Sequence, residues 1–106
     1  MNNQQLLDNL QEGDYVAFAW KDNILGNTII VDQITSINED QVLVHFLYGH
    51  SGEAEWIKKE DILAIGITDR TRVDKLEGYK LQGWRGRFYI LNFTHHLIRE
   101  KLQIRN

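Results

Sequence analysis

The feature that most constrains the fold is the stretch from Gln41 to Ile57, which predicts two short strands joined by a glycine-bounded turn. Gly49–Gly52 is polar and conformationally permissive, so the chain can reverse there before Ala54–Ile57. In the first half of the stretch, alternate side chains fall on opposite faces of a strand: Val42, Val44, Phe46 and Tyr48 on one face, and Leu43, His45 and Leu47 on the other.

The segments around this hairpin carry further strand patterns. Alternating apolar residues and β-branched residues predict strands over Tyr15–Trp20, Thr28–Ile37 and Ile62–Ile67, and residues 58–61 predict a one-turn connector. Leu6, Leu7 and Leu10 are spaced for a short helix that ends before Gly13. Five closely spaced short strands predict a mainly β fold, in which a five-stranded antiparallel barrel occupies residues 12–67.

The last third of the chain, residues 68–106, differs from this pattern and predicts a basic extension. Tyr79–Gln82 and Arg87–Leu91 flank a glycine-bounded tip and predict a β-hairpin. Asn92 is a candidate N-cap, and a helix is predicted after it with an apolar stripe of Phe93, Leu97, Ile98 and Leu102. The stripe must be buried, so we expect the extension to pack on the barrel or on a second copy of the chain.

The net charge of −3 conceals a strong segregation of charge along the chain. Residues 1–69 contain three basic and twelve acidic residues, a balance of −9, whereas residues 70–106 contain nine basic and three acidic residues, a balance of +6. One interpretation is that the basic extension pairs with the acidic body, within the chain or across a homodimer. The other is that its surface stays free for an anionic partner.

Four motifs between Gly13 and Ile65 resemble the Tudor group of SH3-like barrels: GDYVAFAWKDN the opening strand, IIVDQI the second, VHFLYGHSGEAEW the third and fourth, and KKEDIL the short turn that closes the barrel. Chromo-barrel, PWWP and KOW-type domains share much of this pattern. Tudor domains that recognise methylated residues hold the ligand in an aromatic cage. The resemblance places Trp20 and Tyr48 at two cage positions, whereas Asn27, His45 and His50 occupy the others and supply no comparable aromatic wall.

Two groups of residues are candidate binding sites. The first is an aromatic groove at one end of the barrel, formed by Trp20, Tyr48 and Trp56; the alternative is that these side chains fill the core. The second is a nucleic-acid surface that interleaves cations for phosphates with aromatic rings for bases: Arg70, Arg72, Lys80, Trp84, Arg85, Arg87, Arg99 and Lys101. Its alternative is a hairpin whose aromatic residues pack on the barrel, because Phe88 and Ile90 share a face.

The sequence offers little for catalysis or for metal binding. It contains no nucleophile motif and no phosphate-binding glycine loop. There is no cysteine, and His95 and His96 would point about 100° apart on a helix, so we predict no metal site and no cofactor. Glu53 and Glu55 share one side of a strand, which favours a solvated edge over a catalytic pair. No membrane-spanning run or signal peptide is recognised, so a cytoplasmic location is expected.

Together these patterns predict a binding protein that is not an enzyme. Its leading partner is nucleic acid, contacted through the basic extension. The alternative is a protein–protein adaptor or a small inhibitor, such as one encoded by a mobile element, that acts through the acidic face of the barrel.

Overall fold

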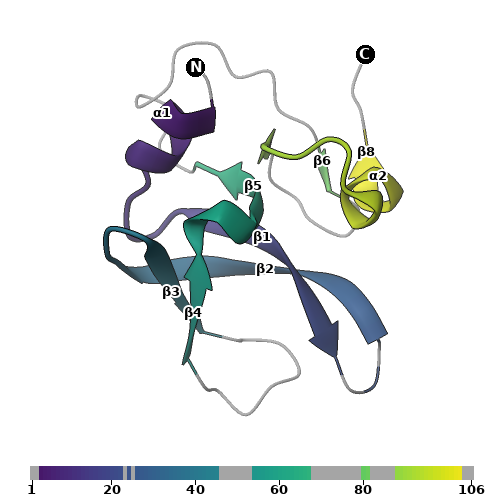
Figure 1. Ribbon diagram of the computed structural model, residues 1–106, viewed down its shortest axis with the longest axis horizontal. Helices are drawn as coiled ribbons and strands as arrows, with labels where there is room; N and C mark the ends of the chain where they lie inside the picture. Colours follow the sequence, from purple (N-terminus) through teal and green to yellow (C-terminus); the bar gives the residue numbers. More distant parts are fainter. Residues whose placement is uncertain are drawn as a thin grey trace.

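The computed structural model describes residues 3–22, 24, 26–45, 54–67, 80–81 and 88–103, with the side chains of Asp22, Lys80, Leu81 and Gln103 left out. Figure 1 shows the chain as a bent sheet with two short helices at separate sides. The elements in order are α1 (Asn3–Asp8), β1 (Tyr15–Asp22), β2 (Gly26–Ile37), β3 (Gln41–His45), β4 (Ala54–Lys58), the 3₁₀ turn η1 (Lys59–Asp61), β5 (Ile62–Gly66), β6 (Lys80–Leu81), β7 (Tyr89–Ile90), α2 (His96–Lys101) and β8 (Leu102–Gln103).

The fold is mainly β, as predicted, and the five predicted strands are present as β1 to β5. Together with β7 they form an antiparallel sheet of six strands in the order β4-β3-β2-β1-β5-β7. The pairing of β7 with β5 was not predicted from the sequence. Among the described residues β4 and β7 are the outer strands, and this sheet does not close on itself.

The sheet bends in the last third of β2, the longest strand. Its first eight residues, Gly26–Gln33, pair with β1, whereas Ile34–Ile37 pair with β3. The register with β3 shifts between Ile34 and Ser36, and the Thr35 hydroxyl between them donates a hydrogen bond of 3.2 Å to the carbonyl of Leu43. An irregularity of this kind bends a strand and increases its twist. The bend carries β3 and β4 across the first two strands.

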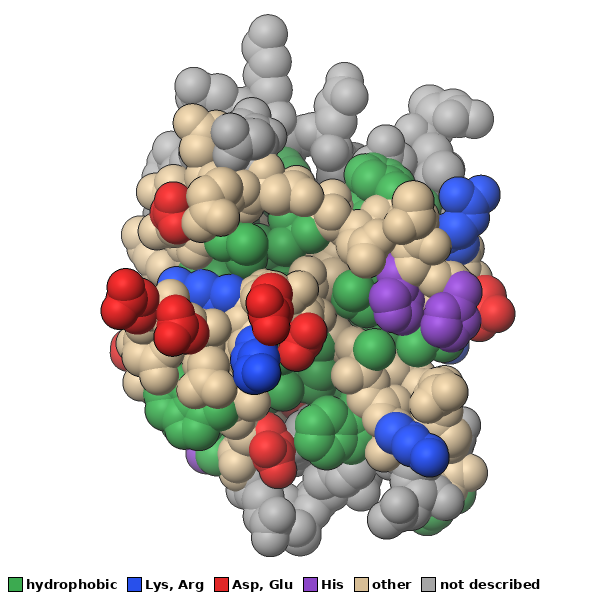
Figure 2. All heavy atoms as spheres, in the orientation of Figure 1, with side chains coloured by type: hydrophobic (Ala, Val, Ile, Leu, Met, Phe, Trp, Pro, Cys, Tyr) green, Lys and Arg blue, Asp and Glu red, His purple; other side chains and the backbone are tan. Residues whose placement is uncertain are grey.

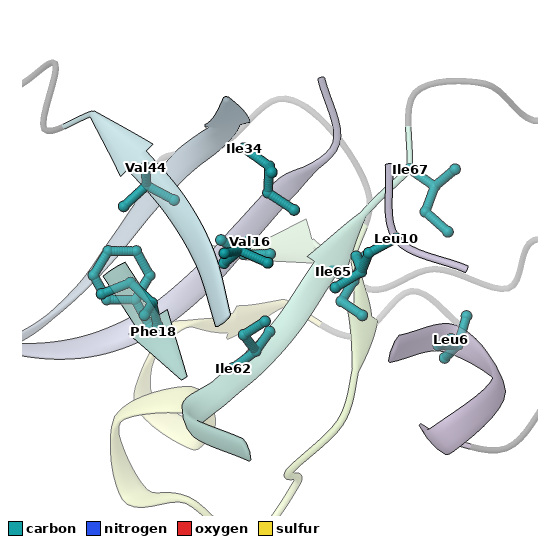
Figure 3. Packing of buried hydrophobic residues seen from close by; sticks show 11 residues of the cluster. Leu6, Leu10, Val16, Phe18, Ile34, Val44, Ile62, Ile65 and Ile67 are labelled. Atoms are coloured by element: carbon teal, nitrogen blue, oxygen red, sulfur yellow. The ribbon is translucent and has the colours of Figure 1, made fainter. Parts of the chain in front are cut away.

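The main hydrophobic core lies on the inner face of this bend (Figure 3). Val16 and Phe18 of β1 contribute to it from one side, and Val42 and Val44 of β3 from another, as their alternation predicts. Leu6 of α1 and Leu10 belong to the same cluster, so the core includes leucines that precede the predicted barrel. A tight turn holds this leading segment in place, because the buried carboxylate of Asp14 accepts a 2.9 Å hydrogen bond from the amide of Gln11.

A second hydrophobic cluster covers the other face of β1 and β5. Ala17, Leu63 and Ala64 form its floor, and Phe88, Ile90 and Ile98 from the C-terminal segment pack on them. Phe88 and Ile98 are both fully buried, at 0% exposed. The shared face of Phe88 and Ile90 therefore packs on the body of the same chain.

The structure corrects two predictions for the C-terminal segment. The predicted basic hairpin is wrong for the described strands, since β6 pairs with β8 and β7 pairs with β5. The predicted helix begins later, at His96, because Asn92 caps a preceding turn instead: its Oδ1 accepts hydrogen bonds from the amide and the hydroxyl of Thr94. Phe93 consequently lies outside the helix and is 43% exposed, whereas Leu97 and Ile98 are buried as predicted.

Gly66 lies beside the ring of Phe88 from the C-terminal segment. A Cβ atom at this position would lie 3.0 Å from Cε1 of Phe88 and 3.3 Å from Cβ of Tyr15. Gly66→Ala is therefore expected to lower the free energy of unfolding by about 1–3 kcal/mol, as overpacking does. Chemical denaturation measures this loss. A Gly66→Ala protein as stable as the wild type would show that the ring of Phe88 can shift to accommodate the added methyl group.

Candidate binding groove

A hollow of about 540 Å³ lies beside the outer strand β4, and we call it the edge groove. It lies between β4, the second half of β1, η1 and the turn before α2. Its lining consists of Phe18, Ala19, Trp20, Gln41, Trp56, Ile57, Lys58, Glu60, Asp61, Leu63, Asn92 and His95. The groove thus follows the side on which the described sheet remains open. Its size is within the range of ordinary ligand pockets.

Two of the three predicted groove aromatics line this hollow. Trp20 is half-buried and its ring stands edge-on to that of Phe18, with centroids 6.4 Å apart and an interplanar angle of 86°. Trp56 lies across the groove on β4 and is 44% exposed, unlike its buried neighbour Ile57, which faces the core. Tyr48 falls outside the described residues. The structure therefore places Trp20 and Trp56 in the lining of one hollow, with unequal exposure, and their role in binding stays a prediction.

The surroundings of the groove are acidic. Glu60 and Asp61 of η1 line it directly, and an adjoining hollow of about 570 Å³ shares Glu60 and adds Asp8, Glu39 and Asp40. Against these five carboxylates, the two hollows contain Lys58 and Lys59, which gives a balance of −3. Figure 2 shows acidic side chains gathered on the half of this face that carries α1, β3 and β4. This surface favours a cationic ligand.

The histidines beside the groove are arranged differently from the prediction. His95 is the N-cap of α2, with extended backbone, and its Nδ1 accepts a 3.2 Å hydrogen bond from the amide of Leu97. Because His95 lies outside the helix, its ring stacks on that of His96, with centroids 4.9 Å apart and an interplanar angle of 16°. The predicted divergence of the two rings is wrong. Within the described residues no group of three or more His, Asp or Glu side chains is arranged to hold a metal ion.

The turn that carries Asn92 to His95 is attached to the sheet. The amides of Leu91 and Asn92 donate hydrogen bonds of 2.8 and 3.3 Å to the carbonyl of Leu63 in β5. This attachment places Asn92 and His95 at the groove opposite β4. Neither residue was predicted there, nor were Glu60 and Asp61, because the sequence carries no local signal for contacts between such distant segments.

The other predicted site residues are only partly described. Arg99 is exposed and Lys101 half-buried, both in the last turn of α2. Lys80 contributes its backbone to β6. Arg70, Arg72, Trp84, Arg85 and Arg87 lie outside the described residues, as do His50 and Glu53.

Of the remaining cage positions, Asn27 lines a smaller hollow of about 270 Å³ that also contains Trp20, His95 and His96. His45 is exposed at the end of β3 and does not line the edge groove. Glu55 is half-buried on β4. Of the two remaining cage positions that are described, Asn27 shares a hollow with Trp20 and His45 does not.

The comparisons with known proteins identify no relative of this chain. No helix in the described part of the chain is both long and apolar enough to cross a membrane. Searches against family models, curated proteins and solved structures find no match for this chain.

Proposed function

We propose that β1 to β5 form an SH3-like barrel of the Tudor kind. Two features support the proposal. The turn η1 falls on the KKEDIL motif, where the resemblance expects a short turn, and β5 after it pairs with β1. The first five strands then follow the order β4-β3-β2-β1-β5, in which the last strand returns beside the first.

On this framework the chain acts as a non-enzymatic adaptor that binds a segment of another protein in the edge groove. The observation that carries this conclusion is Trp56, a large aromatic side chain that is 44% exposed and lines the same groove as Trp20, with carboxylates at its rim. Tryptophan is among the residues that contribute most to protein interfaces. The acidic rim repels phosphates and attracts basic protein segments, so it favours a protein ligand over a nucleic acid at this site.

Selection from a displayed library of random peptides tests this function. The wild-type protein is expected to enrich peptides that contain Lys or Arg and to bind them at micromolar concentrations. A Glu60→Lys/Asp61→Lys protein should bind the same peptides at least about tenfold more weakly, because both carboxylates are exposed at the groove. Failure to enrich any peptide that depends on these two carboxylates would contradict the proposal.

Nucleic-acid binding through the basic extension is the second candidate function. Its support is that Phe88, Ile90 and Ile98 face the body, whereas Arg99 on α2 is exposed. The apolar residues of this segment thus serve packing while at least one of its cations stays on the surface.

Neutralising two arginines of the extension tests the second candidate. Arg85→Gln/Arg87→Gln is expected to weaken binding to mixed-sequence DNA or RNA and to flatten the slope of log K against log salt by about two units, if both residues contact phosphate. Fluorescence anisotropy over a salt series measures the slope. Lys59→Gln, on the acidic body, is the control and should leave the slope unchanged. If the wild-type protein binds neither form at low salt, this candidate fails.

A further inference from the structure

The outer edge of β4 has backbone groups directed away from its neighbour. The amide of Lys59 donates a 2.8 Å hydrogen bond to the carbonyl of Asp40, and the register pairs Ile57 with Val42 and Lys58 with Gln41. Hydrogen-bonded and non-hydrogen-bonded pairs alternate in an antiparallel ladder. The amides and carbonyls of Ala54, Trp56 and Lys58 therefore point outward, and no other described strand pairs with them.

This edge borders the edge groove. Trp56, Ile57 and Lys58 of β4 line one side of the hollow, and Phe18 and Trp20 of β1 line another. A strand added to β4 would lie about 4.8 Å from it. It would then occupy the groove and use the outward backbone groups, as peptides do when they extend a sheet.

The two faces of such an added strand meet different surfaces. On β4 the buried side chain of Ile57 faces the core, and the exposed ring of Trp56 is on the opposite face. Alternate residues of the added strand would therefore face the side of the hollow lined by Phe18 and Ile57 of the main core, and the tryptophan ring with its acidic surroundings. The first set favours apolar side chains. The second favours Lys or Arg, by attraction to the ring face and to Glu60 and Asp61.

We infer that the edge groove binds an extended segment of a partner protein, in which apolar and basic residues alternate, as an added strand on β4. The inference rests on the proposed protein-binding function and specifies its ligand and its geometry. A segment matched to β4 spans about five residues, the length of that strand.

Backbone pairing can be tested on the protein at Lys58. Its φ of −65° and ψ of 136° suit proline, and its amide points away from β3, so Lys58→Pro removes an outward donor without straining the strand. Lys58→Ala is the matched control, because it removes the same charge and keeps the amide. The probe is a fluorescent peptide of alternating valine and arginine. Lys58→Pro is expected to bind it about fivefold more weakly than Lys58→Ala, the effect of one hydrogen bond.

A second measurement does not depend on the folding of a variant. The same peptide, N-methylated at the residues whose amides would face β4, keeps its side chains and loses its backbone donors. We expect the wild-type protein to bind it at least about tenfold more weakly than the unmethylated peptide. A peptide of alternating valine and glutamate should not bind.

The outcomes separate this inference from the function on which it rests. Equal binding of the methylated and unmethylated peptides, or no binding of the valine–arginine peptide, overturns strand addition. If library selection still enriches peptides that depend on Glu60 and Asp61, the adaptor function stands with another binding geometry. If selection also fails, both are wrong.

Discussion

Phe88→Ala is expected to lower the free energy of unfolding by about 3–5 kcal/mol, the range observed when a buried aromatic ring is truncated. Phe88 is 0% exposed and packs on the face of the sheet formed by Ala17, Leu63 and Ala64, with its ring against Gly66. A loss of this size is a large fraction of the stability of a small domain. It would show that the C-terminal segment contributes to the stability of the whole chain.

Phe93→Ala is the matched control, since it removes the same ring from a side chain that is 43% exposed and lies outside both core clusters. We expect it to cost about 1 kcal/mol or less. Urea unfolding followed by circular dichroism compares the two variants. If they lose equal stability, the second face of the sheet is not a core, and the packing of the C-terminal segment described above is wrong.

Trp56→Ala and Trp20→Ala are expected to separate binding from stability. Trp56→Ala should weaken binding of library-selected peptides by about tenfold or more, with little change in stability, because the side chain is 44% exposed and belongs to neither core cluster. Trp20 is half-buried against Phe18 and packs on the main core. Its truncation should cost about 2 kcal/mol, roughly half the loss for a fully buried ring. Thermal melts and peptide titrations of both variants measure the two effects.

The two variants also decide between the interpretations of these tryptophans. Stability loss at Trp56 comparable to that at Trp20, without a specific loss of binding, would assign both rings to the core and remove the support for a groove ligand. Loss of peptide binding at Trp56 alone would support the adaptor function. Leu43→Ala, which truncates the residue paired with Trp56 on β3, is the control. If it weakens peptide binding as much as Trp56→Ala does, the loss of binding is not specific to the tryptophan.

The sequence by itself determined the local elements of this protein. Strict alternation places Val42 and Val44 on the buried face of β3 and leaves Leu43 and His45 on the other face. Neighbouring side chains in a strand point to opposite faces, so this result depends only on local geometry. The same holds for β1, where Val16 and Phe18 enter one cluster and Ala17 the other. The positions of β1 to β5 and the turn at Lys59–Asp61 were predictable for this reason, whereas Leu102, predicted in the helix, lies in β8.

Only the tertiary structure decided which distant segments meet. The strand pattern over Tyr89 and Ile90 predicts extended backbone, but it does not predict which strand they pair with. They pair with β5 and not with the segment that precedes them in the chain. The pairing with β5 is favoured because it buries Phe88 and Ile90 on the apolar face of β1 and β5, against Ala17 and Ala64.

The edge groove also depends on contacts between distant segments of the chain. Trp20, Trp56 with Asp61, and His95 come from three separate parts of the chain. They line one hollow because β2 bends and β4 becomes an outer strand, and these long-range contacts leave no periodic signal in the sequence.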